Sequence, residues 1–396
     1  MRDIEFKYQD TASSPKTIVD SKVIVIYCLT AIMVFFASFR APNAEDMAVS
    51  YSVPTAIRIL QNFSLPIVAF CAFAALYINF VHRKPQNVLR SKFLVFYYIF
   101  HLIVLGSDFA HSGTFDEFVT RVTFTTVIFL FFYHVVSSLP FYNSTRYHVL
   151  NTFFLGSFLF LCLNILLHQT GLGAVSWKGR LLGLTTHPNF IGMCGSIATA
   201  LSFGLLYREK DRLAKMIYFS GVLLGVWVCI LSMSRTSMLG AATAIVIILL
   251  FSLKNNYLKP LIVLLIVLGA VLVISYIDLQ SLDYANRGNT REETWASMYE
   301  EASKLPFFGK GRSGATTNAY LFAIVAGGLL GAFFFFRTVL ASIAVFFTRN
   351  IARYHQTIIL CALIGLILIT SMLEGYLLDA AGIPVFTYWM ILCYIK

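Results

Sequence analysis

Charged residues are scarce in this 396-residue sequence, at 12%, whereas hydrophobic residues make up 58%. The mean hydropathy of +0.76 excludes a soluble globular protein, in which about 25% of residues are charged. Apolar runs long enough to cross a ~30 Å hydrocarbon core recur along the chain. We therefore expect an all-α polytopic integral membrane protein that forms a single transmembrane domain over residues 1–396.

Signatures of cofactors and metals are absent as well. The sequence has no GxxxxGK[ST] loop, no GxGxxG between a strand and a helix, and no CxxC, HExxH or clustered His/Cys set. We therefore expect neither a metal nor a cofactor. All seven cysteines fall within apolar segments, and an odd number of such thiols indicates packing rather than disulfides. The polar first 22 residues predict no cleavable signal peptide.

The apolar segments predict about 12 transmembrane helices. The segment 318–347 is long enough to project beyond the bilayer, and an interfacial helix is expected within 40–62. Two glycine pairs, Gly221/Gly225 and Gly327/Gly331, have the GxxxG spacing that typically marks close helix packing. The predicted spans are 23–39, 64–81, 93–107, 120–139, 149–168, 188–207, 214–233, 236–252, 260–277, 318–347, 355–373 and 382–395.

The formal net charge of +11 reflects topology rather than a nucleic-acid partner. If the N-terminus is cytoplasmic, most of the 30 Lys and Arg residues lie inside and most of the 19 Asp and Glu residues lie outside. This is the distribution that the positive-inside rule requires. We therefore expect cytoplasmic N- and C-termini and no bound nucleic acid.

The only long polar insertion, 278–317, is then an extracytoplasmic loop. Connections of this length are usually functional or disordered, and the aromatic content of this one disfavours disorder. Trp295, Met298, Tyr299 and Ala302 are spaced to form one face of a short amphipathic helix that Pro306 stops. We expect a folded cap that carries part of an active site.

Candidate site residues gather on the same predicted side. Arg180 lies in the loop 169–187, and His187 and Asn189 mark the mouth of the sixth span, where Pro188 suits the first helical position. Arg235 begins the eighth span after a short turn. Arginine offers a planar set of donors to phosphate, and helix N-termini favour anions. A single arginine at an interface is more often a membrane anchor, but several together favour a lipid-linked phosphate ligand.

Three motifs give the chain a family resemblance. GRxxGxxxHPNxxG begins at Gly179, and SxSRTSxLG begins at Ser232. RxxxW from Arg291 is followed by PxxGxG, NxYL and GLLG, which end at Gly331. Together these resemble the O-antigen ligase and Wzy-type O-antigen polymerase superfamily. The resemblance covers roughly 170–335 by motif, whereas the earlier part of the chain matches only in being helical.

The resemblance implies a GT-C type membrane glycosyltransferase with one large periplasmic loop, in the bacterial inner membrane. Its members transfer glycans from undecaprenyl diphosphate by metal-independent inversion at the periplasmic face. By this resemblance Arg180 and Arg235 help to bind the diphosphate, and Arg291 reaches the same cavity from the loop. The further candidate substrate-binding residues are Arg287, Arg312, Trp295, Asn189, Asn318 and Tyr320.

A general base for the acceptor hydroxyl is not determined by the sequence. The candidates are Glu292, Glu293 and His187. Paired glutamates at a helix start are more often favourable partners of the helix dipole, and a histidine before a helix is more often structural. No base is needed if the proton leaves late.

The preferred activity is polymerisation of lipid-linked repeat units into a surface polysaccharide. Ligases typically carry a histidine where this chain has Thr317, before Asn318, so transfer to lipid A core is the alternative. A flippase or transporter of lipid-linked sugars is the alternative of another class. The expected partners are undecaprenyl-diphosphate-linked glycans, membrane lipid and, by resemblance, a chain-length-regulating protein.

Overall fold

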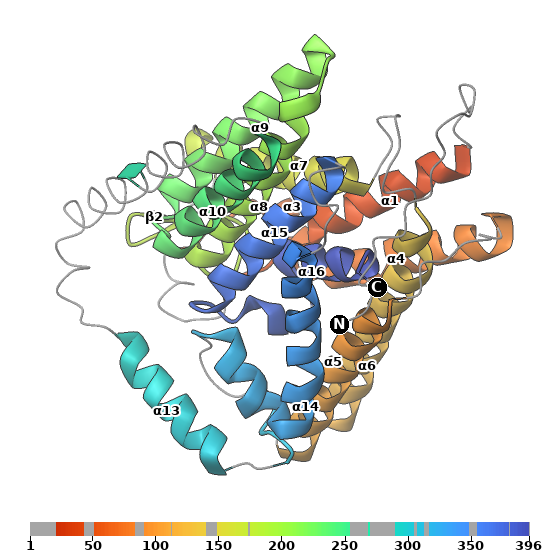
Figure 1. Ribbon diagram of the computed structural model, residues 1–396, viewed down its shortest axis with the longest axis vertical. Coiled ribbons are helices and arrows are strands. Elements are labelled where there is room, and N and C mark those ends of the chain that lie inside the picture. The colour runs from red at the N-terminus through yellow and green to blue at the C-terminus, as the bar shows by residue number, and fades with distance from the viewer. Residues whose placement is uncertain are drawn as a thin grey trace.

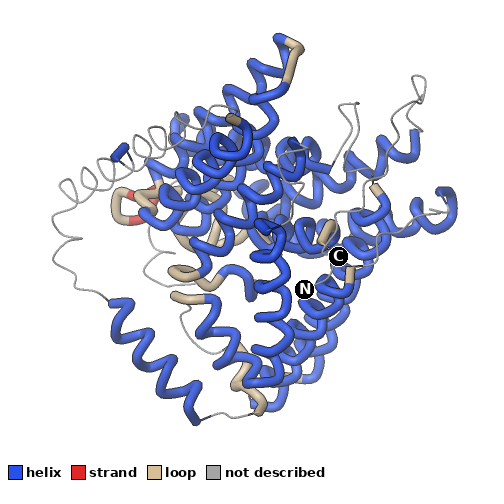
Figure 2. The backbone as a smooth tube through the Cα atoms, viewed as in Figure 1, coloured by secondary structure: helices blue, strands red, loops and turns tan. Residues whose placement is uncertain are grey.

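The computed structural model of the chain is almost entirely helical (Figure 1, Figure 2). It describes most of the chain, in segments separated by short gaps and by one long gap before residue 290. The described residues are 21–42, 51–83, 91–111, 113–139, 149–172, 175–253, 268–269, 290–304, 307–312, 317–347, 355–379 and 381–395.

Long apolar helices form the body of the molecule, and a two-stranded hairpin lies at one end of it. The α-helices are α1 (Ser21–Ala37), α3 (Thr55–Asn62), α4 (Ser64–Ile78), α5 (Lys92–His111), α6 (Phe115–Leu130), α7 (Val149–Thr170), α8 (Pro188–Arg208), α9 (Arg212–Leu231), α10 (Arg235–Ser252), α13 (Thr290–Lys304), α14 (Ala319–Ala344), α15 (His355–Ser371) and α16 (Ile383–Cys393). The strands are β1 (Ser176–Trp177) and β2 (Arg180–Leu181). Short π or 3-10 turns are η1 (Asn79–Arg83), η2 (Phe131–Val135), η3 (Val136–Ser138), η4 (Val345–Phe347) and η6 (Tyr376–Leu378).

Within the described residues, eight helices are long and apolar enough to cross a membrane. Three shorter apolar helices, α1, α15 and α16, accompany them. Every predicted span other than 260–277 coincides with one of these helices, and nearly all of 260–277 lies outside the described residues. The prediction of an all-α polytopic membrane protein is therefore confirmed at that level, whereas the span count and the GT-C architecture stay predictions.

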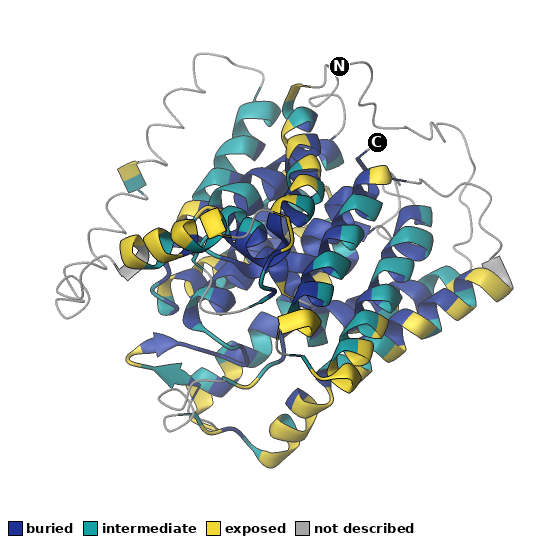
Figure 3. Ribbon diagram, turned by 90° about the horizontal axis from the view of Figure 1, so that it is seen from below, coloured by how far each residue is buried: buried dark blue, intermediate teal, exposed yellow. Residues whose placement is uncertain are grey.

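The helices pack around a central group that has little exposed surface, in which every residue of α16 is buried (Figure 3). Both glycine pairs lie at helix contacts, although Gly327 and Gly331 stand on either side of the non-helical Gly328. Gly221 and Gly225 of α9 face α8, where a methyl group on Gly225 would collide with Thr199. Gly331 of α14 faces Phe100 of α5 at an ordinary contact distance of 3.5 Å. Small residues thus allow the closest helix approaches.

The expected interfacial helix corresponds to α3. Its apolar Ile59 and the following Phe63 are more than half exposed, whereas Gln61 is buried. Gln61 Nε2 donates hydrogen bonds to the Arg40 carbonyl (2.8 Å) and to the Tyr51 hydroxyl (2.5 Å). An apolar outer face and a bonded polar inner face suit a helix at the membrane surface.

The expectation of one long helix over 318–347 is wrong. Gly328 has a non-helical backbone with φ of 62°, and α14 is divided there. The Tyr320 ring lies 6.1 Å from that of Phe335, although a continuous helix would separate these residues by about 22 Å. The chain therefore folds back on itself at Gly328, and the two segments stand side by side in Figure 1.

The segment 307–312 fills the break in α14. The Lys310 N–H donates to the Val325 carbonyl (2.9 Å) and the Gly311 N–H donates to the Ala326 carbonyl (3.0 Å). A helix break leaves such carbonyls without partners, and here the inserted backbone satisfies them. A side chain on Gly328 would collide with the Phe307 carbonyl, so glycine is required for both its positive φ and the close approach.

The predicted amphipathic helix after residue 290 is present as α13, which ends at Lys304 as expected from Pro306. The predicted face is only partly correct. Met298 is buried and Ala302 packs against the core, but Tyr299 is 71% exposed. A spacing of three and four residues places Tyr299 at the edge of the predicted apolar face. The face that α13 packs against α14 is narrower than predicted and leaves Tyr299 out.

Candidate functional site

Arg180 is presented by a β-hairpin. The turn between β1 and β2 is formed by Lys178 and Gly179, whose φ angles are 49° and 75°. Two consecutive residues with positive φ are typical of the type I′ turn that best fits paired strands. Trp177 pairs with Arg180 across the hairpin, and Lys178 Nζ lies 4.8 Å from the centre of the Trp177 ring.

The guanidinium group of Arg180 is enclosed by protein, with the residue only 5% exposed. Its Nε donates to the carbonyl of Ser232 at the end of α9 (2.9 Å), and its Nη2 donates to Oδ1 of Asn189 in α8 (2.6 Å). Arg180 therefore ties the hairpin to the ends of two helices. In this arrangement it positions neighbouring groups, and its buried donors are not presented to a ligand.

His187 caps α8. Its Nδ1 accepts a hydrogen bond from the Asn189 N–H (3.1 Å), so Pro188 occupies the first helical position as expected. Burial, together with the nearby charge of Arg180, lowers the pKa of His187 to about 4. The imidazole is therefore neutral at physiological pH and already holds a structural hydrogen bond.

Arg235 is the first residue of α10 and is exposed. The side chain of Ser234 caps this helix by accepting from the Ser237 N–H (3.3 Å). The Ser237 hydroxyl in turn donates to the carbonyl of Asn189 (3.4 Å). Two of the three motifs that carry the resemblance are thus in contact, and Arg235 stands on their solvent-facing side.

A connection that the sequence did not single out, 372–382 between α15 and α16, reaches this region. Asn189 Nδ2 donates to Oε1 of Glu374 (2.7 Å), and the ring of Phe190 lies 6.3 Å from that of Tyr376. The Leu377 carbonyl accepts a hydrogen bond from the Tyr97 hydroxyl of α5 (2.5 Å). This connection therefore links the Arg180 region to the first half of α5.

Asp379, in the same connection, interacts electrostatically with Arg312 and Arg40. Its side chain is exposed, yet it lies deep enough among the helices for burial to raise its pKa to about 6, against the opposing effect of the two arginines. Burial likewise lowers the pKa of Arg40 to about 10. A carboxylate that titrates near neutrality between two cations is an arrangement typical of a functional site.

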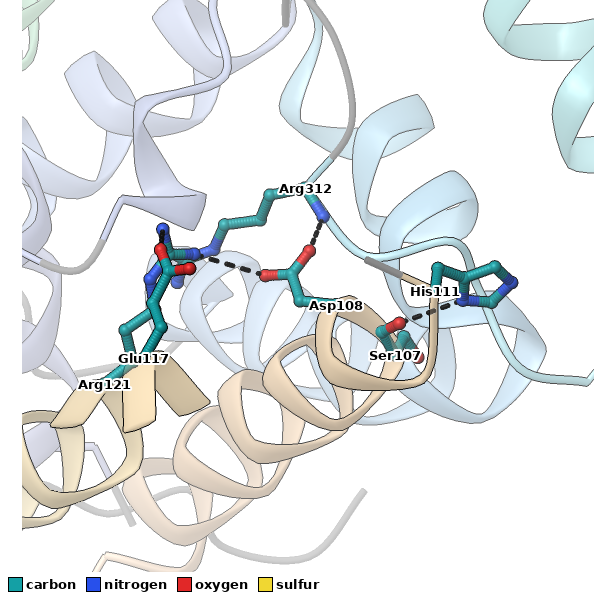
Figure 4. A network of polar contacts seen from close by, with 6 residues as sticks. All are labelled: Ser107, Asp108, His111, Glu117, Arg121 and Arg312. Atoms are coloured by element: carbon teal, nitrogen blue, oxygen red, sulfur yellow. Dashed lines mark hydrogen bonds and ion pairs between the residues drawn. The ribbon is translucent and has the colours of Figure 1, made fainter. Parts of the chain in front are cut away.

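Arg312 enters a second cluster, shown in Figure 4. Its backbone N–H donates to Asp108 at the end of α5, and Asp108 Oδ2 lies 3.6 Å from Nη1 of Arg121 in α6. Arg121 also pairs with Glu117, one turn earlier in the same helix. Burial lowers the pKa of Arg312, and Asp379 and Asp108 oppose that shift.

These residues form a chain of polar and electrostatic interactions across the ends of helices that lie far apart in sequence. We refer to this set as the polar band. It consists of Arg40, Asp108, Glu117, Arg121, Arg180, Asn189, Ser232, Arg312, Glu374 and Asp379. Its members come from connections predicted to be extracytoplasmic or, for Arg121, Asn189 and Ser232, from the adjoining ends of predicted spans.

No family model matches the chain, and no curated protein is similar to it in sequence. The resemblance described above therefore depends on the motifs alone.

The remaining predicted residues lie apart from the polar band or outside the described residues. Glu292 and Glu293 are exposed in the first turn of α13, in the position where acidic residues favour the helix dipole. The side chains of Arg287 and Arg291 lie outside the described residues. Trp295 is half-buried, and its Nε1 is shielded and has no hydrogen-bond partner among the described residues.

Asn318 and Tyr320 make contacts that build the fold. Asn318 Oδ1 caps α14 by accepting from the N–H groups of Tyr320 (2.9 Å) and Leu321 (3.1 Å). The Tyr320 hydroxyl donates to the Leu368 carbonyl of α15 (2.8 Å). Their roles as substrate-binding residues stay predictions. Within the described residues, no group of His, Cys, Asp and Glu has a metal-binding arrangement.

Proposed function

We propose that this chain is a membrane glycosyltransferase that polymerises polyprenyl-diphosphate-linked repeat units into a surface polysaccharide. The observation that carries the proposal is Asp379, an accessible carboxylate within electrostatic reach of Arg40 and Arg312, on a connection that also contacts Asn189. A base beside fixed cations suits the transfer of a sugar from a phosphate leaving group. The motif resemblance supports the same reaction.

The proposed reaction is a direct displacement. A hydroxyl oxygen of the incoming repeat unit forms a bond to the anomeric carbon of the growing glycan. The bond from that carbon to the diphosphate oxygen breaks, and its electron pair leaves with the diphosphate. Asp379 accepts the proton of the attacking hydroxyl. The leaving group is already stable, so charge stabilisation and alignment are the main contributions of the protein.

The roles of the arginines differ. Arg235, exposed at the N-terminus of α10, is proposed to contact the diphosphate, where the helix dipole adds to its charge. Arg180 is proposed as a positioning residue that holds the Ser232 turn, and therefore Arg235, in place. Arg291 is retained as a diphosphate ligand from the motif resemblance.

The decisive experiment is elongation by the purified protein in liposomes. Repeat units linked to polyprenyl diphosphate, isolated from cells that lack this chain, would serve as both donor and acceptor. We expect a ladder of longer lipid-linked products with the wild type. We expect Asp379→Asn to reduce the rate by about 100-fold or more, as is typical for loss of a general base.

Glu300→Gln is the matched control. Glu300 is an exposed carboxylate on α13 that pairs with Lys304 and lies outside the polar band. The Glu300→Gln protein should elongate the glycan at the wild-type rate. Wild-type protein that yields no product longer than the starting unit would refute the proposal, as would Asp379→Asn protein that elongates normally.

Transport of lipid-linked sugars is a second candidate, because one observation favours it. The break of α14 at Gly328 resembles the discontinuous helices of many transporters. Here, however, the Val325 and Ala326 carbonyls at the break accept hydrogen bonds from backbone N–H groups. Movement of the lipid between leaflets of the same liposomes, without elongation, would favour the transporter.

A further inference from the structure

A pocket of about 200 Å³ lies beside the Arg312 cluster, between the end of α5 and the beginning of α6. It is smaller than the ~300–1,000 Å³ typical of sites for drug-sized ligands, and it has room for a single sugar ring. Leu105, Asp108, Phe109, Glu117, Arg121 and Arg312 form most of its wall.

Arg312 supplies unsatisfied donors at this pocket. Its Nε and Nη2 are shielded from solvent and have no hydrogen-bond partner among the described residues. These nitrogens form one edge of the guanidinium group, the edge that can donate to two oxygen atoms at once. Leaving such donors unpaired is unfavourable, so an acceptor in the pocket is stabilised once the guanidinium turns toward it.

The acceptors are placed around the same space. Asp108 Oδ2 has no hydrogen-bond donor among the described residues and lies only 3.6 Å from Arg121. Glu117 stands at the mouth of the pocket with its side chain 52% exposed, and Asp108 lies deeper, at 19%. The deeper wall thus holds both donors and acceptors just behind its surface, and a ligand reaches them once the Arg312 and Asp108 side chains turn into the pocket.

The balance of charge decides which ligand fits. Two arginines and two carboxylates contribute equal numbers of positive and negative charges, so a phosphate in the pocket would face Asp108 and Glu117 at close range. A sugar hydroxyl both donates and accepts, and it can therefore use Arg312 and Asp108 together. The neighbouring Phe109 and Phe118 rings, 4.8 Å apart, add apolar surface for the carbon face of a sugar ring.

We propose that this pocket is a subsite for one uncharged sugar ring of the glycan. Neighbouring hydroxyl groups of the ring accept from Arg312 and donate to Asp108, and Glu117 and Arg121 close the mouth. The assignment of the sugar to a lipid-linked glycan rests on the proposed function, whereas binding of a neutral sugar does not. Because Arg312 also interacts with Asp379, the subsite adjoins the proposed base and would align the acceptor.

The test is direct sugar binding, measured separately from elongation. The probe is the repeat-unit oligosaccharide released from its lipid by mild acid, titrated against the full chain in nanodiscs and followed by saturation-transfer NMR. We expect saturation of a single ring. Asp108→Asn should weaken binding about tenfold, in line with loss of a hydrogen bond to a charged group. Glu117→Gln should weaken it less.

Glu300→Gln is again the matched control and should bind like the wild type. Asp108 also accepts a hydrogen bond from the Arg312 backbone, so Asp108→Asn could fail to fold. Glu117 lies at the exposed mouth, and Glu117→Gln keeps the test decisive in that case. Equal affinity in wild type and Glu117→Gln, or no sugar binding by the wild type, would overturn the subsite.

Two further outcomes separate the alternatives. If inorganic diphosphate displaces the oligosaccharide, and binds more tightly to Glu117→Gln, the pocket is an anion site and the sugar proposal fails. If pocket variants weaken sugar binding while wild-type protein elongates nothing, the subsite stands and the polymerase proposal fails. If the wild-type protein elongates the glycan and the pocket variants bind sugar normally, the polymerase proposal stands and the subsite fails.

Discussion

At the scale of single residues, Arg180 and Arg235 show how similar motif positions acquire different surroundings. Arg180 is buried and donates to Ser232 and Asn189, whereas Arg235 is exposed at the start of α10. An arginine whose donors are bonded to protein is costly to remove, because its partners become buried and unpaired. The contacts of an exposed arginine contribute little to stability, so a loss of activity on its removal reports on the ligand.

This difference predicts separate effects for the two arginines. Arg180→Ala should destabilise the protein by about 2–4 kcal/mol through two lost hydrogen bonds, and elongation should fall with it. Arg235→Ala should unfold at the wild-type temperature but elongate poorly. Thermal unfolding in detergent, paired with the liposome assay, measures both. The reverse pattern would assign the diphosphate to Arg180 and a structural role to Arg235.

The titration of Asp379 gives a second prediction at this scale. Its pKa is raised to about 6, and only the carboxylate can accept a proton. The elongation rate should therefore rise with pH through about 6 and level off above it. His187, with a pKa lowered to about 4, is neutral throughout this range and cannot produce the transition. A rate–pH profile that is flat between pH 5 and 8 would exclude Asp379 as the base.

The same raised pKa has a consequence for stability. A carboxyl group with a higher pKa in the folded state than in the unfolded state binds its proton more tightly when folded. Its contribution to stability is therefore lost as pH rises from its ordinary value of 3.8 through about 6. Asp379→Asn should unfold at a higher temperature than the wild type at pH 7.5, and this difference should shrink at pH 4. An equal difference at both values would show that the surrounding helix ends do not raise the pKa of the carboxyl group.

At the scale of elements, α14 is the clearest departure from expectation. Its hydropathy is continuous, and periodicity alone cannot distinguish one long helix from two segments that fold back. The break depends on Gly328, on Gly311 and on the 307–311 backbone that pairs with α14. These contacts join the segment before α14 to the middle of α14, so the sequence pattern of α14 alone does not contain them.

Two glycines of α14 make a matched pair of variants. Gly328→Ala would place a side chain in a left-handed backbone conformation and against the Phe307 carbonyl. It should cost at least about 1–2 kcal/mol from the backbone conformation alone. Gly331→Ala adds a methyl group at ordinary contact distances, 3.5 Å from Phe100, and should change the unfolding temperature little. Similar unfolding temperatures for the two variants would argue against the break.

At the scale of the whole molecule, the proposed function requires the polar band to lie on the extracytoplasmic side of the membrane. Tyr299, 71% exposed on α13, should lie on the extracytoplasmic side, and Lys210, between α8 and α9, should lie in the cytoplasm. In cells, Tyr299→Cys should react with a membrane-impermeant maleimide, whereas Lys210→Cys should react only after the membrane is opened. Labelling of Lys210→Cys alone in intact cells would place the polar band in the cytoplasm and remove the basis for the proposed substrate.

The sequence motifs indicated two of the regions that form the candidate site, but they did not indicate Asp379 or Glu374. The motifs around Arg180 and Arg235 pointed to two regions that the structure brings into contact through Asn189 and Ser237. Asp379 and Glu374 belong to a short connection without a motif, and only their acidic character at the end of apolar spans could have drawn attention to them. Glu292 and Glu293 of α13 were predicted as candidate bases from their position beside Arg291, and both lie exposed, apart from the polar band.

The sequence by itself determined that the chain is an all-α membrane protein and where almost all of its described helices lie. Both follow from local hydropathy, because a helix in lipid satisfies its own backbone hydrogen bonds. Only the tertiary structure decided the fold-back at Gly328, the burial of Arg180 and the placement of Asp379 within electrostatic reach of Arg40 and Arg312. These features depend on which helix ends meet, and that depends on packing between segments that lie tens to hundreds of residues apart in the sequence.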